Sequence, residues 1–242
     1  MFPFAPGCRS IPPGPSPVLS GMTLWLESDY GVALSGSNVL TIADRSGHVA
    51  PWASTAGYRP TAAATGKGGK QVLHFDGDLS QFLQGDLGWD ASTPPIAAEI
   101  FLCFKGNIAS GVGDNTGPLE TQNTGYVSSW TYYGHAMQVL MSDGGRYNWT
   151  QAHPEYWHLL DAMGDLTTGN LAVRMWVDTV LQYTDNAAGV TMVWKPHGSP
   201  CYIAKNNGYY SYMDFSGMLA YPRRLTDPER AQNAAYFATR WI

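Results

Sequence analysis

The sequence predicts an all-β fold in which two antiparallel sheets form a sandwich. Of the 242 residues, 14% are charged and 13% are aromatic, a composition that suits strands with one buried face. The chain also has 27 glycines, which suit the tight turns between short strands. About a dozen apolar or alternating segments lie between turn residues, and no helical segment separates them, which favours a sandwich over an α/β fold.

The N-terminal segment 1–21 is predicted to be an extended arm. A secretory signal needs a basic start and an uninterrupted apolar stretch, and this segment has neither. Each proline fixes φ and moves the preceding residue out of the α region, so the backbone should be polyproline-like. We therefore expect a retained arm over 1–21 and one domain over 22–242. The prolines are Pro3, Pro6, Pro12, Pro13, Pro15 and Pro17.

Strands are expected along the whole of the predicted domain. The clearest alternation lies in 170–183, where Val173 and Met175 face one way and Arg174 and Trp176 the other. A tight turn at 178–179 makes this segment a half-solvated antiparallel hairpin. The other expected strands include 22–28, 70–78, 97–106, 125–132, 135–141, 156–160, 191–194 and 200–204.

One helix is predicted at the C-terminus. Thr226 and Glu229 form a capping box, and Pro228 lies in the first turn. The residues that then recur at helical spacing form a narrow stripe of mostly small side chains, which we expect to pack closely against a sheet. The stripe consists of Ala231, Ala234, Ala235, Ala238 and Trp241.

Short motifs follow one another in a recognisable order. The chain has an apolar strand followed by Asp29, Gly31 and Val32, then Asp44-x-Ser46-Gly47, Pro60-Thr61, Phe75-Asp76-Gly77, Val177-Asp178-Thr179, Gly217, and a closing Arg223 or Arg224, Leu225, Thr226 and Glu229. This ordered set resembles the laminin-G-like branch of the concanavalin A-like jelly rolls, in the form common in bacterial and phage surface proteins. The sequence departs from the family pattern at Thr179, where the family has a turn glycine. The resemblance implies a two-sheet jelly roll over 22–242, but this fold hosts lectins, hydrolases and scaffolds.

Charge and composition exclude several function classes. The net charge is −5 and the chain has no run of Lys or Arg, so a nucleic-acid partner is not expected. No apolar run approaches the roughly 18 residues of a membrane span. Three cysteines are too few for a disulfide framework. Cys103 and Cys201 read as buried thiols in strands, and a bridge between them is left open.

The sequence does not predict an enzyme or a resident cofactor. The retaining glycoside hydrolases of this fold class carry Glu-x-Asp-x-x-Glu, and the nearest fragment here, Glu27 and Asp29, lacks the third acid. Asp114 and Asp143 lie in glycine-rich loops and are the candidate ligands for calcium. Because Asp is an ordinary loop residue, no metal is expected, with calcium as the open alternative.

Aromatic residues beside Asn, Gly and His are the candidate contacts for a glycan or a protein partner. Flat aromatic faces suit the C–H faces of sugar rings and suit protein interfaces as well. Strand alternation should bury about half of them. The candidates are Trp130, Tyr132, Tyr133, Trp149, Tyr209 and Tyr210.

Two functions compete. The first is a non-enzymatic structural protein of a bacteriophage virion, a capsid decoration or fibre-associated protein assembled in the host cytoplasm as a homo-oligomer such as a trimer. Its arm would dock on the major capsid protein or another virion protein through Phe2, Pro3, Phe4, Pro12 and Pro13. The alternative is a carbohydrate-binding, lectin-like module that recognises host surface glycans. A glycoside hydrolase ranks third.

Overall fold

The computed structural model describes residues 14–89, 95–106, 116–123, 126–133, 136–140, 146–150, 156–168, 171–187, 201–206 and 209–242. In these ranges almost all regular structure is antiparallel strand, and the C-terminal helix α1 (Asp227–Arg240) is the only α-helix. The predicted all-β sandwich with a short C-terminal helix is confirmed. No described helix is both long and apolar enough to cross a membrane.

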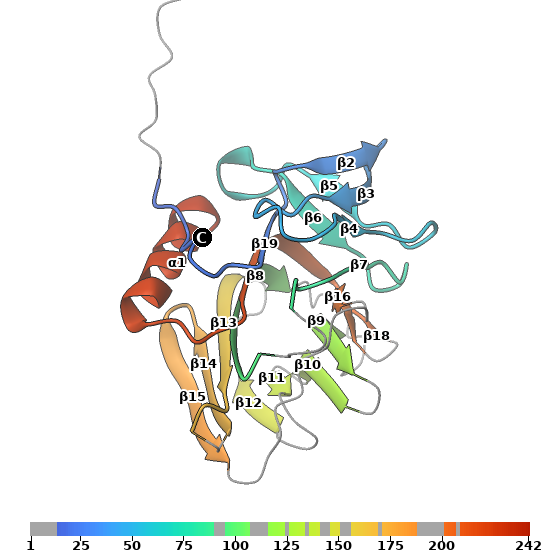
Figure 1. Ribbon diagram of the computed structural model, residues 1–242. Coiled ribbons are helices and arrows are strands. Elements are labelled where there is room, and N and C mark those ends of the chain that lie inside the picture. Colours follow the sequence, from blue (N-terminus) through green and yellow to red (C-terminus); the bar gives the residue numbers. More distant parts are fainter. Residues whose placement is uncertain are drawn as a thin grey trace, which may run out of the picture.

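The strands form two layers (Figure 1). The first layer has the order β1-β19-β8-β13-β14-β15, with β1 (Leu24–Glu27), β19 (Met213–Tyr221), β8 (Ala97–Gly106), β13 (Trp157–Asp165), β14 (Leu171–Val177) and β15 (Val180–Ala187). The second layer contains β2 (Val32–Ser35), β3 (Asn38–Ile42), β4 (Trp52–Ala53), β5 (Thr61–Ala63), β6 (Val72–Phe75), β7 (Leu83–Gly85), β16 (Cys201–Ile203), β9 (Thr116–Asn123), β10 (Tyr126–Tyr133), β11 (Ala136–Leu140) and β12 (Arg146–Thr150). A short hairpin of β17 (Lys205–Asn206) and β18 (Tyr209–Tyr210) is separate.

β19 connects the two layers, because its first residues pair with β6 and its remaining residues pair with β1. The predicted strand at 191–194 and residues 1–13 of the predicted arm lie outside the described residues. The last part of the arm packs on α1, where the amide of Val18 donates to Asn233 Oδ1 at 2.8 Å and Gln232 Nε2 donates to the carbonyl of Ser16 at 2.9 Å.

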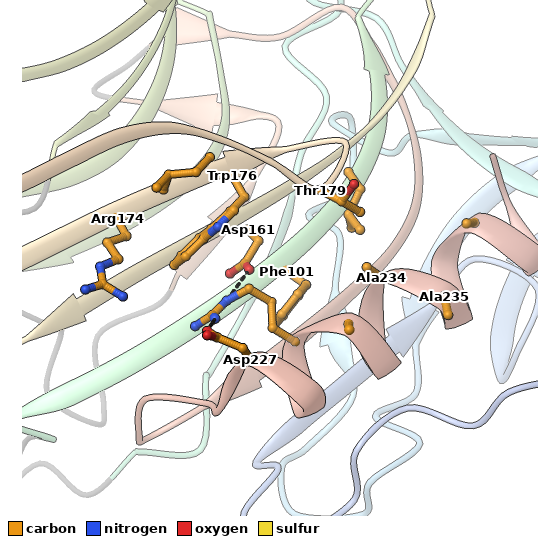
Figure 2. A pocket seen from close by; sticks show the side chains of 13 residues that line it. Phe101, Asp161, Arg174, Trp176, Thr179, Asp227, Ala234 and Ala235 are labelled. Carbon is orange, nitrogen blue, oxygen red and sulfur yellow. Dashed lines mark hydrogen bonds and ion pairs between the residues drawn. The ribbon is translucent and has the colours of Figure 1, made fainter.

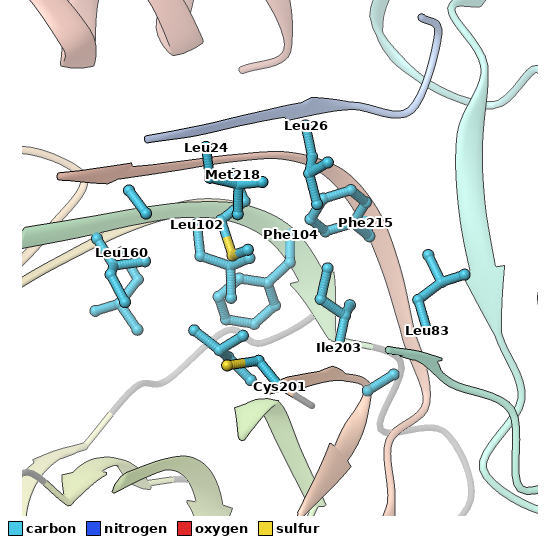
Figure 3. Close-up of a cluster of buried hydrophobic side chains, with 14 of the residues drawn as sticks. Leu24, Leu26, Leu83, Leu102, Phe104, Leu160, Cys201, Ile203, Phe215 and Met218 are labelled. Atoms are coloured by element: carbon cyan, nitrogen blue, oxygen red, sulfur yellow. The ribbon is translucent and has the colours of Figure 1, made fainter. Parts of the chain in front are cut away.

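The long strand β8 is apolar on both faces because each face has its own core. Ile100 and Leu102 point into the cluster between the two layers (Figure 3), whereas Phe101 and Cys103 point into a second cluster beneath α1. Successive side chains of a strand point to opposite faces, so a strand covered on both sides reads as a continuous apolar run. The helix therefore forms a third layer over the outer face of the first sheet.

The β14–β15 hairpin confirms the predicted alternation. Val173 and Met175 are fully buried between the layers, while Arg174 and Trp176 lie partly exposed on the outer face. The turn is built from Asp178 (φ 49°) and Thr179 (φ 72°), as expected for the tight turns that match strand twist.

Replacing Thr179 with glycine should stabilise the protein by about 0.5–1 kcal/mol, because a β-branched residue is strained at positive φ. The gain is partly offset by the greater freedom of glycine in the unfolded chain. Urea unfolding of Thr179→Gly and of Thr179→Ala checks this, since alanine keeps the Cβ and should gain less. A loss of stability in Thr179→Gly would contradict the account of the turn.

Candidate functional site

Helix α1 does not pack on the sheet through its alanine stripe. The capping box of Thr226 and Glu229 is present as predicted, so the helix begins where expected. However, Tyr236 and Phe237 are buried, whereas most of the stripe is exposed. The expected packing is therefore wrong for Ala231, Ala235 and Ala238, and correct only for Ala234 and Trp241. The reason is that burying two aromatic rings removes far more apolar surface from water than burying alanines does.

The exposed alanines instead form one wall of a pocket of about 660 Å³ between α1 and the β14–β15 hairpin (Figure 2). The opposite wall comes from the outer face of the sheet and includes Trp176 and Leu181. Figure 2 shows Trp176 and Arg174 projecting from the hairpin, with Ala234 and Ala235 on the helix side. The volume lies in the range of about 300–1,000 Å³ that is typical of small-molecule sites.

A buried charge cluster lies at the base of this pocket. Arg230 Nε lies 2.9 Å from Glu99 Oε1 and 3.0 Å from Asp161 Oδ2, and Arg230 Nη1 lies 2.7 Å from Asp227 Oδ1. The guanidinium carbon also lies 3.9 Å from the ring centroid of Trp176. One guanidinium therefore contacts three carboxyl groups and holds the tryptophan ring against the helix.

The two buried acids differ in their partners. Glu99 accepts a hydrogen bond from the amide of Leu225 at 2.8 Å as well as those from Arg230. Asp161 has no backbone donor of this kind among the described residues and forms an ion pair with Arg230 through Oδ2. Its side chain is only 4% exposed and lies at the base of the pocket, so the carboxyl group shapes the charge of the pocket floor from beneath its surface.

Burial raises the pKa of both acids. For Asp161 the loss of hydration raises the pKa well above its usual range, and the nearby charge of Glu99 raises it further. For Glu99 burial also raises the pKa, while the guanidinium of Arg230 opposes this shift. Asp161 is therefore the acid that holds a proton more readily, and a protonated carboxyl can both donate and accept hydrogen bonds.

The six predicted aromatic contacts lie on strands other than those of the pocket. Trp130, Tyr132 and Tyr133 lie in β10, Trp149 lies in β12, and Tyr209 and Tyr210 form β18. The register brings two of them into one row, because Met137 of β11 pairs with Tyr132 on one side and with Trp149 on the other. Tyr210 lies elsewhere, with its ring centroid 6.1 Å from that of Phe82.

Other predicted site residues are not tested by the structure. The arm residues Phe2, Pro3, Phe4, Pro12 and Pro13 and the calcium candidates Asp114 and Asp143 lie outside the described residues. Within the described part of the chain, no group of three or more His, Cys, Asp or Glu side chains could hold a metal ion.

Two cysteines and one acid of the sequence analysis lie in the interior of the protein. Cys103 and Cys201 are both buried and form no disulfide with each other, and burial raises the pKa of Cys103 to about 12. Glu27 is buried and contacts Arg45, Tyr236 and Arg240, with 2.6 Å between Arg240 Nε and Glu27 Oε1. Tyr236 and Arg240 belong to α1, so the contacts of Glu27 hold the helix against the sheet.

No protein-family model matches the chain, and no curated protein matches it in sequence. Solved structures do match. Domain 4 of AbnA, a GH43 extracellular arabinanase from Geobacillus stearothermophilus, in complex with arabinotriose, has a TM-score of 0.61 and 12% identity, over 88% of this chain and 97% of that one. The binding domain of botulinum neurotoxin DC in complex with SialylT has a TM-score of 0.62 and 9% identity, over 91% of this chain and 52% of that one.

A further match is the same neurotoxin binding domain in complex with rat synaptotagmin II, with a TM-score of 0.58 and 10% identity over 91% of this chain and 52% of that one. The chain thus spans about half the length of the neurotoxin binding domains it matches. At such low identity these similarities show the fold, a β-sandwich that is shared with carbohydrate- and receptor-binding domains.

Proposed function

We propose that this protein is a carbohydrate-binding β-sandwich domain and that a saccharide binds in the pocket between α1 and the β14–β15 hairpin. The observation that carries the proposal is the placement of polar side chains, Arg174 and Asp227, around an aromatic wall, Trp176, in one pocket. Binding pockets commonly combine an apolar surface with a few polar groups that fix the orientation of the ligand.

The pocket matches the chemistry of a sugar ring. A pyranose or furanose presents C–H groups, which pack on the indole of Trp176 and on the alanine wall, and hydroxyl groups, which need both donors and acceptors. Asp227, whose side chain is 89% exposed, supplies an acceptor, Arg174 supplies donors, and Thr179 supplies a hydroxyl that does either.

The structural neighbours support the same conclusion independently. One of them is solved with arabinotriose and another with SialylT. The first prediction from sequence, a structural protein of a bacteriophage virion, stays a prediction, since its docking residues in the arm lie outside the described chain. The pocket and the neighbours both favour glycan recognition, and the proposed role is binding without catalysis.

A glycan array probed with the full chain tests the proposal. We expect binding to at least one saccharide class, and a loss of about tenfold or more in affinity in Trp176→Ala, because removing a stacked ring costs about 1.4 kcal/mol or more. Tyr156→Ala removes an aromatic side chain that is 59% exposed and outside the lining residues, so it serves as the matched control.

A second variant separates loss of the site from loss of folding. Ala235→Leu leaves every polar group in place and suits a helix, but its larger side chain fills part of the pocket. It should bind less tightly while unfolding at the same temperature as the native chain. Undiminished binding in both Trp176→Ala and Ala235→Leu would show that the pocket is not the saccharide site.

A further inference from the structure

A cluster of four aromatic side chains lies on the second layer, away from the pocket. Phe82, which is only 7% exposed, lies at the centre of the cluster, and the rings of Tyr58, Tyr202 and Tyr210 surround it at centroid distances of 5.8, 5.7 and 6.1 Å. The three tyrosines come from the β4–β5 loop, from β16 and from β18. Tyr58 is 42% exposed, and Tyr202 and Tyr210 are half-buried, so the cluster presents an aromatic surface to solvent.

A lysine ammonium group lies over this aromatic cluster. Lys205 Nζ is 4.2 Å from the ring centroid of Tyr202 and 4.9 Å from that of Phe82. Within the described ranges no carboxylate forms an ion pair with it. The positive charge is therefore fixed in place by cation–π contacts, and its own hydrogen-bond donors face no anion of this part of the chain.

Two strained residues hold the cluster in this arrangement. Ser80 (φ 54°) lies two positions before Phe82, and Ala204 (φ 64°) directly precedes Lys205. Neither is glycine, so each left-handed conformation is strained. The amide of Ser211 donates to the carbonyl of Ala204 at 2.9 Å, and the amide of Phe82 donates to the carbonyl of Tyr58 at 3.1 Å. Such strain is typical of places where the backbone must aim particular side chains.

The cluster and the pocket are separate. The pocket lies between α1 and the β14–β15 hairpin, whereas β16 and β18 lie on the other side of the sandwich (Figure 1). The two groups of residues share no member. A ligand can therefore occupy one without contacting the other.

We propose that the Phe82 cluster, defined as Tyr58, Phe82, Tyr202, Tyr210 and Lys205, is a second saccharide site and that it takes acidic sugars. The tyrosine faces stack on the C–H groups of the ring, and Lys205 forms a charge-assisted hydrogen bond with a sugar carboxylate. A neutral sugar satisfies the aromatic surface but brings no anion to the ammonium group. This goes beyond the proposed function, because it adds a ligand class at a site that does not depend on the pocket.

Calorimetric titration with matched acidic and neutral probes tests the proposal. The pairs are 3′-sialyllactose with lactose, and trigalacturonic acid with its methyl ester. We expect at least one acidic probe to bind about tenfold more tightly than its neutral partner, since a hydrogen bond to a charged group contributes about 1.5 kcal/mol or more. This preference should weaken as salt is raised.

Variants assign the acidic probe to one site. Lys205→Met keeps an apolar stem over the rings but removes the charge, so it should abolish the preference for the acidic probe. Tyr58→Ala should weaken the binding of every probe at the cluster. Trp176→Ala in the pocket should leave the preference unchanged. The proposal is overturned if no acidic probe binds, if acidic and neutral probes bind equally, if Lys205→Met keeps the preference, or if Trp176→Ala alone removes it.

None of these outcomes would contradict array binding that depends on Trp176. The proposal for the pocket and the proposal for the Phe82 cluster can therefore be rejected independently.

Discussion

Replacing Arg230 with methionine should lower the free energy of unfolding by about 3–5 kcal/mol, because it leaves buried acids without their cation. Glu99 is fully buried and Asp161 nearly so, and Arg230 is the guanidinium that contacts both. Without it, either the carboxylates stay ionised in an apolar environment or they take up protons at a cost that grows with pH. Chemical denaturation at pH 7 measures the effect.

Two further variants make this prediction specific. Asp227→Asn removes a carboxylate that contacts the same guanidinium but is 89% exposed, so it should cost less than about 1 kcal/mol. Arg230→Met combined with Glu99→Gln removes the uncompensated charge and should recover part of the stability. If Arg230→Met costs no more than Asp227→Asn, the charge cluster is not a stabilising feature of α1 docking.

Replacing Asp161 with asparagine should make stability depend less steeply on pH. Burial raises the pKa of Asp161, so above about pH 4 the unfolded chain binds fewer protons than the folded chain. The free energy of unfolding therefore falls as the pH rises toward the folded-state pKa, by at most about 1.4 kcal/mol per pH unit for one group. Glu99, whose pKa is also raised, acts in the same direction.

The expected result is a relative stability of the variant that increases with pH. Asp161→Asn has the size of the protonated acid and no proton to release, so its stability relative to the native chain should rise from pH 4 to pH 8. Thermal unfolding followed across this range checks the sign. A constant difference between the two proteins at all pH values would show that Asp161 ionises in the folded chain as it does in the unfolded chain.

Local patterns in the sequence predict much of the fold. The alternation over 170–183 places Trp176 and Arg174 on the outer face correctly, and the capping box places the start of α1 correctly. The apolar run over 97–106 becomes the central strand β8, with cores on both faces. These features depend on neighbouring residues, which is why the sequence alone contains them.

The pocket depends instead on which face of α1 packs on the sheet. The alanine stripe recurs at helical spacing, and so does the buried set Arg230, Asn233, Ala234 and Phe237, so periodicity does not say which face is buried. The charge cluster is also non-local, since Arg230 and Glu99 are 131 residues apart. The available signal was Glu99 itself, an acid within an otherwise apolar strand, because such a residue needs a buried partner.

The central claim is that the pocket between α1 and the β14–β15 hairpin binds a saccharide, and an NMR titration tests it most directly. The chain has nine tryptophans, and each indole N–H gives a signal that can be assigned by substitution. With the saccharide that binds best on the array, the Trp176 signal should shift in a saturable way, with its half-maximal shift at the dissociation constant measured by calorimetry. Saturable shifts confined to the other tryptophans, with the Trp176 signal unmoved, would contradict the account.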